Sequence, residues 1–439
     1  MSYAASLVRV PPGRATSRAA TGRRGARTLG AVTEERVVIA GAGLAGVQTA
    51  AELRQQGWQG RVILVGAEPH PPYDRPPLSK EVLLGTASAD AGPELGVDLA
   101  ALGVETRLGT TATGVRTAAR VLDTDAGPEP YDHLVLATGA EAVTLPGTAG
   151  VPGVHVLRTL DDARRLRGAL DERLALVIAG AGWIGAEAAT AARAAGCQVT
   201  VVEAASHPLH GALPAEVTAP MHRWYEEAGV RLLTGSRVRA VRAGNGARGG
   251  EVELADGTVI AAGAVLVGVG SRPATGWLAG SGIPLADDGS VLADERLRAG
   301  APGVWAAGDC ASYPSARYRR RLLVQHWDNA LTGPRTVAAG VLGRDGARHD
   351  PVPYFWSEQF GRHVQYAGLH EPGDELLWRG SPEEAAWTAC WLREGRLTAV
   401  LAVGRPRDLT QGRKLMAAGA ALDPARAADP SVPLKAAVR

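Results

Sequence analysis

The sequence predicts an α/β fold with two Rossmann-like dinucleotide-binding units and a small third domain. Two apolar strands each run directly into a G-x-G-x-x-G turn and a helix, and each unit then adds a second strand that ends in a glutamate. From about Asp350 the sequence becomes rich in tryptophan and alternates in hydrophobicity, which is typical of antiparallel strands. These features together predict the three parts of the fold.

Composition limits the classes of protein to consider. The chain has 439 residues, of which 46% are hydrophobic, enough for two or three packed domains. The net charge is +2 with both signs interspersed, which gives no long-range attraction to nucleic acid. No run of about eighteen apolar residues could span a bilayer and no signal-peptide core follows Met1. We therefore expect a cytoplasmic protein with neither a nucleic-acid nor a membrane partner.

Residues 1–33 have a composition of their own. They carry six arginines, no acidic residue and no hydrophobic periodicity, which predicts a disordered N-terminal extension. The same composition imitates an organellar transit peptide, and Val32 could also be the natural start of the protein. The pattern favours disorder or a misplaced start over targeting.

The first dinucleotide-binding unit follows immediately. The strand RVVIA (36–40) leads into GAGLAG, a helix over 47–57 and a second strand over 61–68. Gly41 allows the tight turn, Gly43 lets a pyrophosphate approach the backbone, and Gly46 packs the helix on the strand. Glu68 ends the second strand, where a carboxylate can accept hydrogen bonds from ribose hydroxyls.

The second unit repeats this pattern from Leu174. Its fingerprint glycines are Gly180, Gly182 and Gly185, and Glu203 is the matching acid. The three residues after Glu203 carry no charge and Glu203 itself would repel a 2′-phosphate, so NAD is favoured over NADP. Two dinucleotide sites in one chain suggest hydride transfer between two cofactors, and a flavin is the usual partner of a nicotinamide.

The rest of the chain adds strands and few reactive groups. Further strands are predicted over 133–139, 258–270 and 303–310, antiparallel strands over 355–368 and 385–404, and an alanine-rich C-terminal helix that frays. Cys197, Cys310 and Cys390 lie far apart, which argues against a redox dithiol, a zinc site or an iron–sulfur cluster. We expect no metal site, and Cys310 is read as a small buried residue.

The stretch PPYDRPPLSK (71–80) is typical, in isolation, of a polyproline ligand. It lies inside the first dinucleotide-binding unit, however, directly after the strand that ends at Glu68. That position favours a structural segment whose prolines fix φ and so hold Arg75 and Lys80 in place.

Eight motifs in this order resemble one family: GAGLAG, PPYDRPPLSK, LATGA, GAGWIGAE, GVGSRP, AAGDCA, HWDNA and YFWSEQ. They resemble the FAD-dependent, NADH-oxidising ferredoxin reductases of the putidaredoxin-reductase and rubredoxin-reductase type, over about residues 35–404. The resemblance implies an FAD domain (34–141 and 271–348), an inserted NAD domain (142–270) and a C-terminal domain (349–439). It also implies that the first fingerprint binds FAD and the second binds NAD.

The resemblance assigns roles to individual residues. Lys80 and Glu187 are expected to form a catalytic ion pair beside the N5 edge of the flavin, with Glu187 in the first turn of its helix. Asp309 is expected to accept hydrogen bonds from the ribityl chain, and the next helix is expected to face the pyrophosphate. Trp183 is expected to border the nicotinamide, and we hypothesise that it shields the flavin until NADH arrives. The other expected cofactor contacts are Leu44, Ala45, Arg75, Ala112, Ala137, Thr138, Gly139, Ile184, Val269, Gly270, Gly308, His326, Trp327 and Trp356.

The chain also departs from the family pattern. The family frequently has an aspartate where this chain has Ala67 and an arginine where it has Glu141, which bears on the contacts to FAD adenosine. The run SARYRRRL carries four arginines, at 317, 319, 320 and 321. A solvated face and a docking surface for an acidic ferredoxin are about equally favoured for this run.

The resemblance implies that NADH reduces FAD, which then passes single electrons to a two-iron ferredoxin. A haem-thiolate monooxygenase or a ring-hydroxylating dioxygenase would lie downstream. Two alternatives stay open. The acceptor could be rubredoxin, a quinone or oxygen, or the chain could be a nicotinamide-sensing flavoprotein similar to apoptosis-inducing factor.

Overall fold

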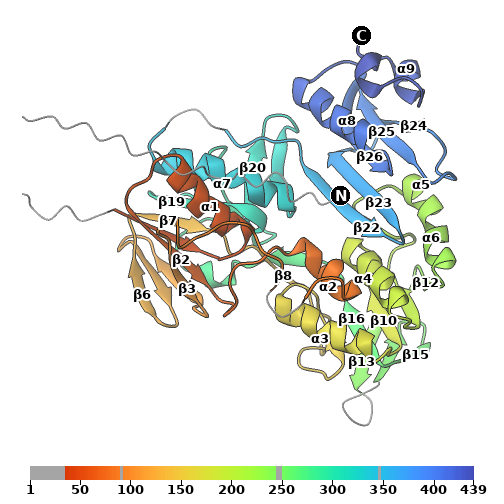
Figure 1. Ribbon diagram of the computed structural model, residues 1–439, viewed down its shortest axis with the longest axis horizontal. Helices are drawn as coiled ribbons and strands as arrows, with labels where there is room; N and C mark the ends of the chain where they lie inside the picture. Colours follow the sequence, from red (N-terminus) through yellow and green to blue (C-terminus); the bar gives the residue numbers. More distant parts are fainter. Residues whose placement is uncertain (1–34, 89–91, 244–249, 345–347) are drawn as a thin grey trace, which may run out of the picture.

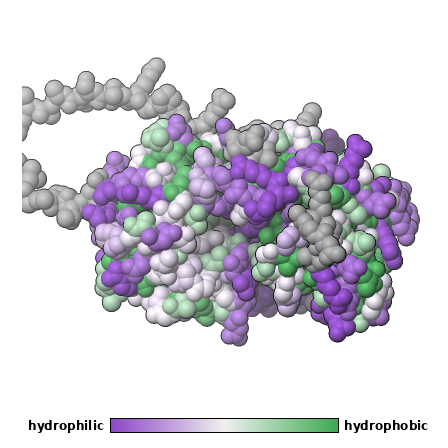
Figure 2. Space-filling view, turned by 90° about the horizontal axis from the view of Figure 1, so that it is seen from below, coloured by the Kyte–Doolittle hydropathy of each residue, from purple (hydrophilic) through white to green (hydrophobic). Residues whose placement is uncertain are grey.

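The computed structural model describes residues 35–88, 92–243, 250–344 and 348–439. The predicted disordered extension, residues 1–33, lies outside the described residues. Figure 1 shows two α/β bodies and a third body that carries the C-terminus. No helix in the described part of the chain is long and apolar enough to cross a membrane. The face in Figure 2 intersperses hydrophilic and hydrophobic residues.

The first body is built on a parallel sheet in the order β19-β7-β1-β2-β3. Its strands are β1 (Arg36–Ala40), β2 (Arg61–Gly66), β3 (Glu105–Leu108), β7 (His133–Leu136) and β19 (Val304–Ala306). Helices α1 (Leu44–Gln55) and α7 (Trp327–Val341) pack on one face of the sheet. The other face is covered by the small sheet β4 (Ala112–Arg116), β5 (Val121–Thr124) and β6 (Gly127–Pro130). Strands β1, β2 and β7 are almost entirely buried because a layer covers each face of the sheet.

The second body repeats this plan in the order β12-β11-β10-β16-β9. Its parallel strands are β9 (Val154–His155), β10 (Leu176–Ala179), β11 (Val199–Val202), β12 (Arg231–Leu233) and β16 (Ala264–Val267). Helices α3 (Leu160–Asp171) and α4 (Trp183–Ala194) cover one face. The antiparallel strands β13 (Val238–Ala243), β14 (Gly250–Leu254) and β15 (Val259–Ala262) cover the other.

A short antiparallel pair joins the two bodies. Strand β8 (Ala140–Ala142) pairs with β17 (Ser271–Pro273), so the chain leaves the first body and returns to it at one point. The returning chain forms the sheet of β18 (Val291–Leu292), β20 (Ala311–Ser315) and β21 (Arg320–Leu323) before it enters α7. This connection lets one chain place two dinucleotide-type folds beside each other.

The third body is an antiparallel sheet in the order β22-β23-β26-β25-β24. Its strands are β22 (Tyr354–Gln359), β23 (Arg362–Gly368), β24 (Glu375–Arg379), β25 (Trp387–Arg393) and β26 (Arg396–Val403). Helix α8 (Pro406–Ala418) packs on one face. The other face packs on α5 (Ala215–Thr218) and α6 (His222–Glu227) of the second body.

Two features of the C-terminal part differ from expectation. Strand β24 was not predicted from the sequence, and its residues, ELLWR, do not alternate between apolar and polar. The C-terminal segment does not fray, because α9 (Pro424–Ala428) and the 3₁₀ helix Leu434–Ala437 bury Leu434 and Ala437 completely. The remaining short helical elements are α2 (Glu81–Leu84) and 3₁₀ turns at Pro76–Ser79, Ala219–Met221, Gly276–Leu278 and Gly308–Cys310.

Candidate active site at the junction of three bodies

The first fingerprint forms a phosphate cradle between β1 and α1. Gly41 has φ +116°, and a Cβ there would lie 2.1 Å from the Ala137 carbonyl oxygen. A Cβ on Gly46 would lie 1.9 Å from the carbonyl oxygen of Gly41, so both positions require glycine. Gly43 instead faces open space, and the N-terminus of α1 has neither a side-chain cap nor an acidic first turn. The free amides at this helix end suit the pyrophosphate of a dinucleotide.

The second fingerprint has the same geometry between β10 and α4. Gly180 has φ +104°, and a Cβ there would lie 2.4 Å from the carbonyl oxygen of Gly268. A Cβ on Gly185 would lie 2.1 Å from the Gly180 carbonyl oxygen, whereas Gly182 faces open space at an uncapped helix end. The protein therefore contains two cradles, each of which fits a dinucleotide pyrophosphate.

Glu203 lies just after β11 and stabilises the second cradle through two hydrogen bonds. Its Oε2 accepts a hydrogen bond of 2.7 Å from the Ala181 amide, and its Oε1 accepts one of 2.8 Å from the Ala205 amide. Each carboxylate oxygen has a second lone pair that a ribose hydroxyl can use. Ile184 and Val269, both expected cofactor contacts, are 40% and 42% exposed.

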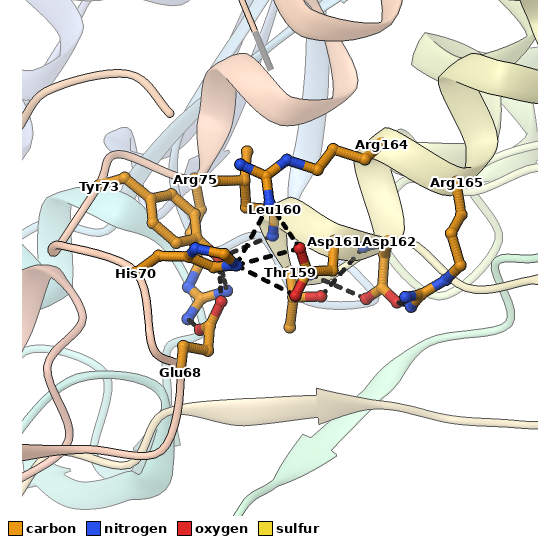
Figure 3. A network of polar contacts seen from close by, with 10 residues as sticks. All are labelled: Glu68, His70, Tyr73, Arg75, Thr159, Leu160, Asp161, Asp162, Arg164 and Arg165. Carbon is orange, nitrogen blue, oxygen red and sulfur yellow. Dashed lines mark hydrogen bonds and ion pairs between the residues drawn. The ribbon is translucent and has the colours of Figure 1, made fainter. Parts of the chain in front are cut away.

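Glu68 lies two residues beyond β2 and belongs to a polar network (Figure 3). Its two oxygens accept hydrogen bonds from Arg75, at 2.6 Å, and from the Tyr73 hydroxyl, at 2.5 Å. Burial raises the pKa of Tyr73 above its ordinary value. The segment that begins PPYDRPP is therefore folded back onto the first body, and Pro76–Ser79 forms a 3₁₀ turn rather than a polyproline helix.

The same network joins the first body to the start of α3. Tyr73 Oη accepts a hydrogen bond of 2.8 Å from the Leu160 amide, and His70 Nε2 lies 3.0 Å from Asp161 Oδ1 (Figure 3). A capping box between Thr159 and Asp162 fixes where the helix begins. These contacts connect the two bodies, and none of them was predicted from the sequence.

Asp309 lies in the 3₁₀ turn after β19, and its carboxylate pairs with Arg158 at 2.9 Å. Arg158 also donates to the carbonyl oxygen of Ala140 at 2.8 Å. The chain continues from this turn into strands β20 and β21, and the next helix, which was expected to face the pyrophosphate, is α7. Sequence reasoning also missed Arg158, whose only local signal is its place before the Thr159 cap.

Other expected contacts lie in or beside the first body. Thr138 donates its hydroxyl to the Ala274 carbonyl oxygen at 2.8 Å, and a Cβ on Gly139 would lie 3.4 Å from Arg158. Gly308 lies so close to Ala45 that a Cβ on Gly308 would lie 2.8 Å from the Ala45 Cβ.

Ala112 begins β4, outside the main sheet, and packs partly against the first body's core. Leu44 is the first residue of α1, and Gly270 has φ +124° just before β17.

An aromatic group lies where the first body meets β22. Burial lowers the pKa of His326 to about 4, so the imidazole is neutral at pH 7. Trp327 donates to Asp74 at 2.8 Å and packs edge-on against Trp356, with ring centroids 5.7 Å apart. Trp183 packs against Phe355 of β22, with centroids 4.4 Å apart. The fingerprint of the second body therefore packs, through Trp183, against strand β22 of the third body.

At the centre of this junction Lys80 and Glu187 form the predicted ion pair. Lys80 Nζ lies 2.9 Å from Glu187 Oε2, and the two side chains are only 9% and 3% exposed. Glu187 is the fifth residue of α4, so it lies in the second turn rather than in the expected first turn. Its carboxylate also accepts hydrogen bonds from Ser79 and Ser357, two residues that sequence reasoning missed.

The expected absence of cysteine and metal chemistry stays a prediction. All three cysteines are buried and unpaired, and burial raises the pKa of Cys310 to about 11. Among the described residues no group of three histidine, cysteine or acidic side chains could hold a metal ion. Glu141, one of the departures from the family pattern, is exposed and pairs with Arg272 at 2.7 Å.

Two dinucleotide cradles that share a buried ion pair define a nucleotide-dependent oxidoreductase of two-cofactor type. Residues 35–333 match the pyridine nucleotide-disulphide oxidoreductase family, and residues 354–438 match the reductase C-terminal family. The chain belongs to the pyridine nucleotide-disulphide oxidoreductase family, and carries the C-terminal domain of its reductases.

Curated relatives and solved structures agree with this assignment. The chain is 37% identical to rhodocoxin reductase of Rhodococcus erythropolis over 408 residues, which are 92% of this chain and 94% of the relative. It is 37% identical over 405 residues, 91% of this chain and 98% of the relative, to the ferredoxin–NAD(+) reductase component of the Burkholderia cepacia anthranilate 1,2-dioxygenase system. The crystal structure of a covalent putidaredoxin reductase–putidaredoxin complex matches with a TM-score of 0.86 and 32% identity, covering 91% of this chain and 97% of that one.

Proposed function

We propose that this protein is an NADH-dependent ferredoxin reductase that uses FAD. Members of the family use FAD and NAD(H), and the two cradles fit the pyrophosphates of these two dinucleotides. The single observation that best supports the proposal is the buried pair Lys80–Glu187, which joins the two bodies that carry the cradles. A bound FAD would supply hydride acceptance from NADH and single-electron release to the acceptor.

We assign the first cradle to FAD and the second to NAD. Glu68 and Arg75 would hold the FAD side of the site, with Asp309 and Arg158 beside them. Trp327 and Trp356, the former fixed by Asp74, would line the flavin and exclude water. The corresponding domains are 34–141 with 271–348 for FAD, 142–270 for NAD and 349–439 at the C-terminus.

The two charges of the ion pair have complementary roles in the reaction. The Lys80 ammonium would stabilise negative charge on the flavin side, and the Glu187 carboxylate would stabilise positive charge on the nicotinamide as it is oxidised. Glu203 would bind the adenosine ribose and reject a 2′-phosphate. We infer that the protein works in the cytoplasm, where NADH is available.

The acceptor is a small two-iron ferredoxin that feeds an oxygenase. Relatives are named as ferredoxin reductase components of dioxygenase systems, and one solved relative is bound to putidaredoxin. In the described residues no cysteine pair offers a dithiol relay. The protein would therefore pass electrons from a bound flavin to the acceptor without a dithiol relay.

The test is anaerobic stopped-flow spectroscopy of the purified yellow protein. NADH should bleach the flavin absorbance much faster than NADPH, and a two-iron ferredoxin should reoxidise the protein faster than rubredoxin, a quinone or oxygen. Fastest reoxidation by one of the other acceptors would assign that acceptor instead. Slow turnover with every acceptor, together with a long-lived charge-transfer band, would support a nicotinamide-sensing role.

A further inference from the structure

Glu187 connects residues from all three bodies. Its Oε2 accepts hydrogen bonds from Lys80 and Ser79, which belong to the first body. Its Oε1 faces the opposite way and meets β22 of the third body, where Ser357 Oγ donates at 2.6 Å. The only other contact of Oε1 among the described residues is the Glu358 amide at 3.4 Å, too long for a strong bond.

The Ser357 hydroxyl is itself held in one orientation. Ser357 is completely buried and Gln359, two residues along the same strand, is 1% exposed. Gln359 Nε2 donates to Ser357 Oγ at 3.1 Å, which leaves the hydroxyl proton free to point at Glu187. A buried hydroxyl with a fixed donor and a charged acceptor is a strong and directional contact.

We propose that Ser357 is a positioning residue for the NADH reaction: it fixes the carboxylate of Glu187, so that the third body completes the nicotinamide site. This inference rests on the proposed function. Lys80 alone would pull the carboxylate toward the first body, and Ser357 opposes that pull from the other side. The carboxylate is thus held in one place between the first and third bodies.

The first measurement is the rate of flavin reduction by NADH in Ser357→Ala. A hydrogen bond to a charged group corresponds to roughly a tenfold change, so the limiting reduction rate should fall about tenfold. The NADH dissociation constant should change less than about twofold, because the contact acts on Glu187 and not on the nucleotide. Ser357→Thr, which keeps the hydroxyl, should restore the rate. Gln359→Leu should give an intermediate rate.

Thr388→Val is the matched control. Thr388 is also completely buried in the third body, and it donates its hydroxyl to a carboxylate, Asp408, at 3.1 Å. Its substitution should leave the reduction rate unchanged. Equal loss of rate in this variant and in Ser357→Ala would show that both act through stability, and would overturn the proposal.

The second measurement does not depend on turnover. In hydrogen exchange with NAD⁺ added to the FAD-loaded protein, amides 180–185 and 354–359 should both become protected in the wild type. In Ser357→Ala the protection at 354–359 should disappear, while that at 180–185 remains. Wild-type protection at 180–185 alone would overturn the role of Ser357. No protection at 180–185 would contradict the NAD site itself, and with it the proposed function.

Discussion

Removing the positive partner of the buried pair gives the sharpest test of the site. In Lys80→Met the Glu187 carboxylate remains buried at 3% exposure without its counter-ion. Breaking a buried pair in this way typically costs about 3–5 kcal/mol. Ser79 and Ser357 still donate to the carboxylate, so we expect the lower end, about 3 kcal/mol of unfolding free energy.

A double-mutant cycle separates the pair from its surroundings. Glu187→Gln removes the negative charge, and the double variant Lys80→Met/Glu187→Gln removes both charges. The double variant should be more stable than Lys80→Met alone, with a coupling free energy of about 2 kcal/mol. Urea unfolding followed by tryptophan and flavin fluorescence measures each corner of the cycle.

The control is Lys414→Met, because Lys414 is an exposed lysine of α8. It should change the unfolding free energy by less than about 0.5 kcal/mol. A coupling free energy below about 0.5 kcal/mol would refute the reasoning, since it would mean that the two charges are solvated independently. In the same variants, Lys80→Met should slow flavin reduction by NADH more than it weakens FAD binding.

Three further outcomes are expected. Glu203→Ala with Ser206→Arg should shift the preference from NADH toward NADPH, measured as the ratio of kcat/KM values, and unchanged selectivity would contradict a ribose role for Glu203. Neutralising Arg319 and Arg320, both exposed, should lower kcat/KM for an acidic ferredoxin about threefold and flatten its salt dependence, while reduction of a neutral dye stays the same. Because burial lowers the pKa of His326 from 6.5 to about 4, the unfolded state binds more protons between these pH values. Unfolding free energy should therefore decrease as pH falls from about 6.5 to about 4, and His326→Gln should flatten that slope in pH-dependent urea titrations.

The local parts of the site could be predicted from the sequence. Gly41 and Gly180 are required by the backbone of a strand–helix turn, and a turn of this kind is encoded in six consecutive residues. The ion pair of Lys80 and Glu187, which are 107 residues apart, was predicted from the resemblance to the ferredoxin reductases and not from a local pattern.

The missing parts are contacts between segments distant in the sequence. Arg158 meets Asp309, and Ser357 meets Glu187, across 151 and 170 residues. Neither contact leaves a periodicity or a spacing in the chain, because it depends on how whole bodies pack. The arginine run shows the same limit, since Arg317 and Arg321 donate to backbone carbonyls and so are less available for docking than their sequence suggests.

The choice of lysine at position 80 follows from the number of acceptors around it. Arginine is the usual cation in this chain, and buried Arg379 shows what such a residue needs: its guanidinium donates to Asp408 and to the carbonyl oxygens of Ala427, Asp429 and Val432. Lys80 Nζ donates to Glu187 and, at 3.3 Å, to the carbonyl oxygen of Pro76. A guanidinium with five donors would leave several of them without acceptors among the described residues at this buried position, at a cost of about 1–3 kcal/mol each. An ammonium has three donors, so two are satisfied by the protein and the third remains for the cofactor that the cradles would bind.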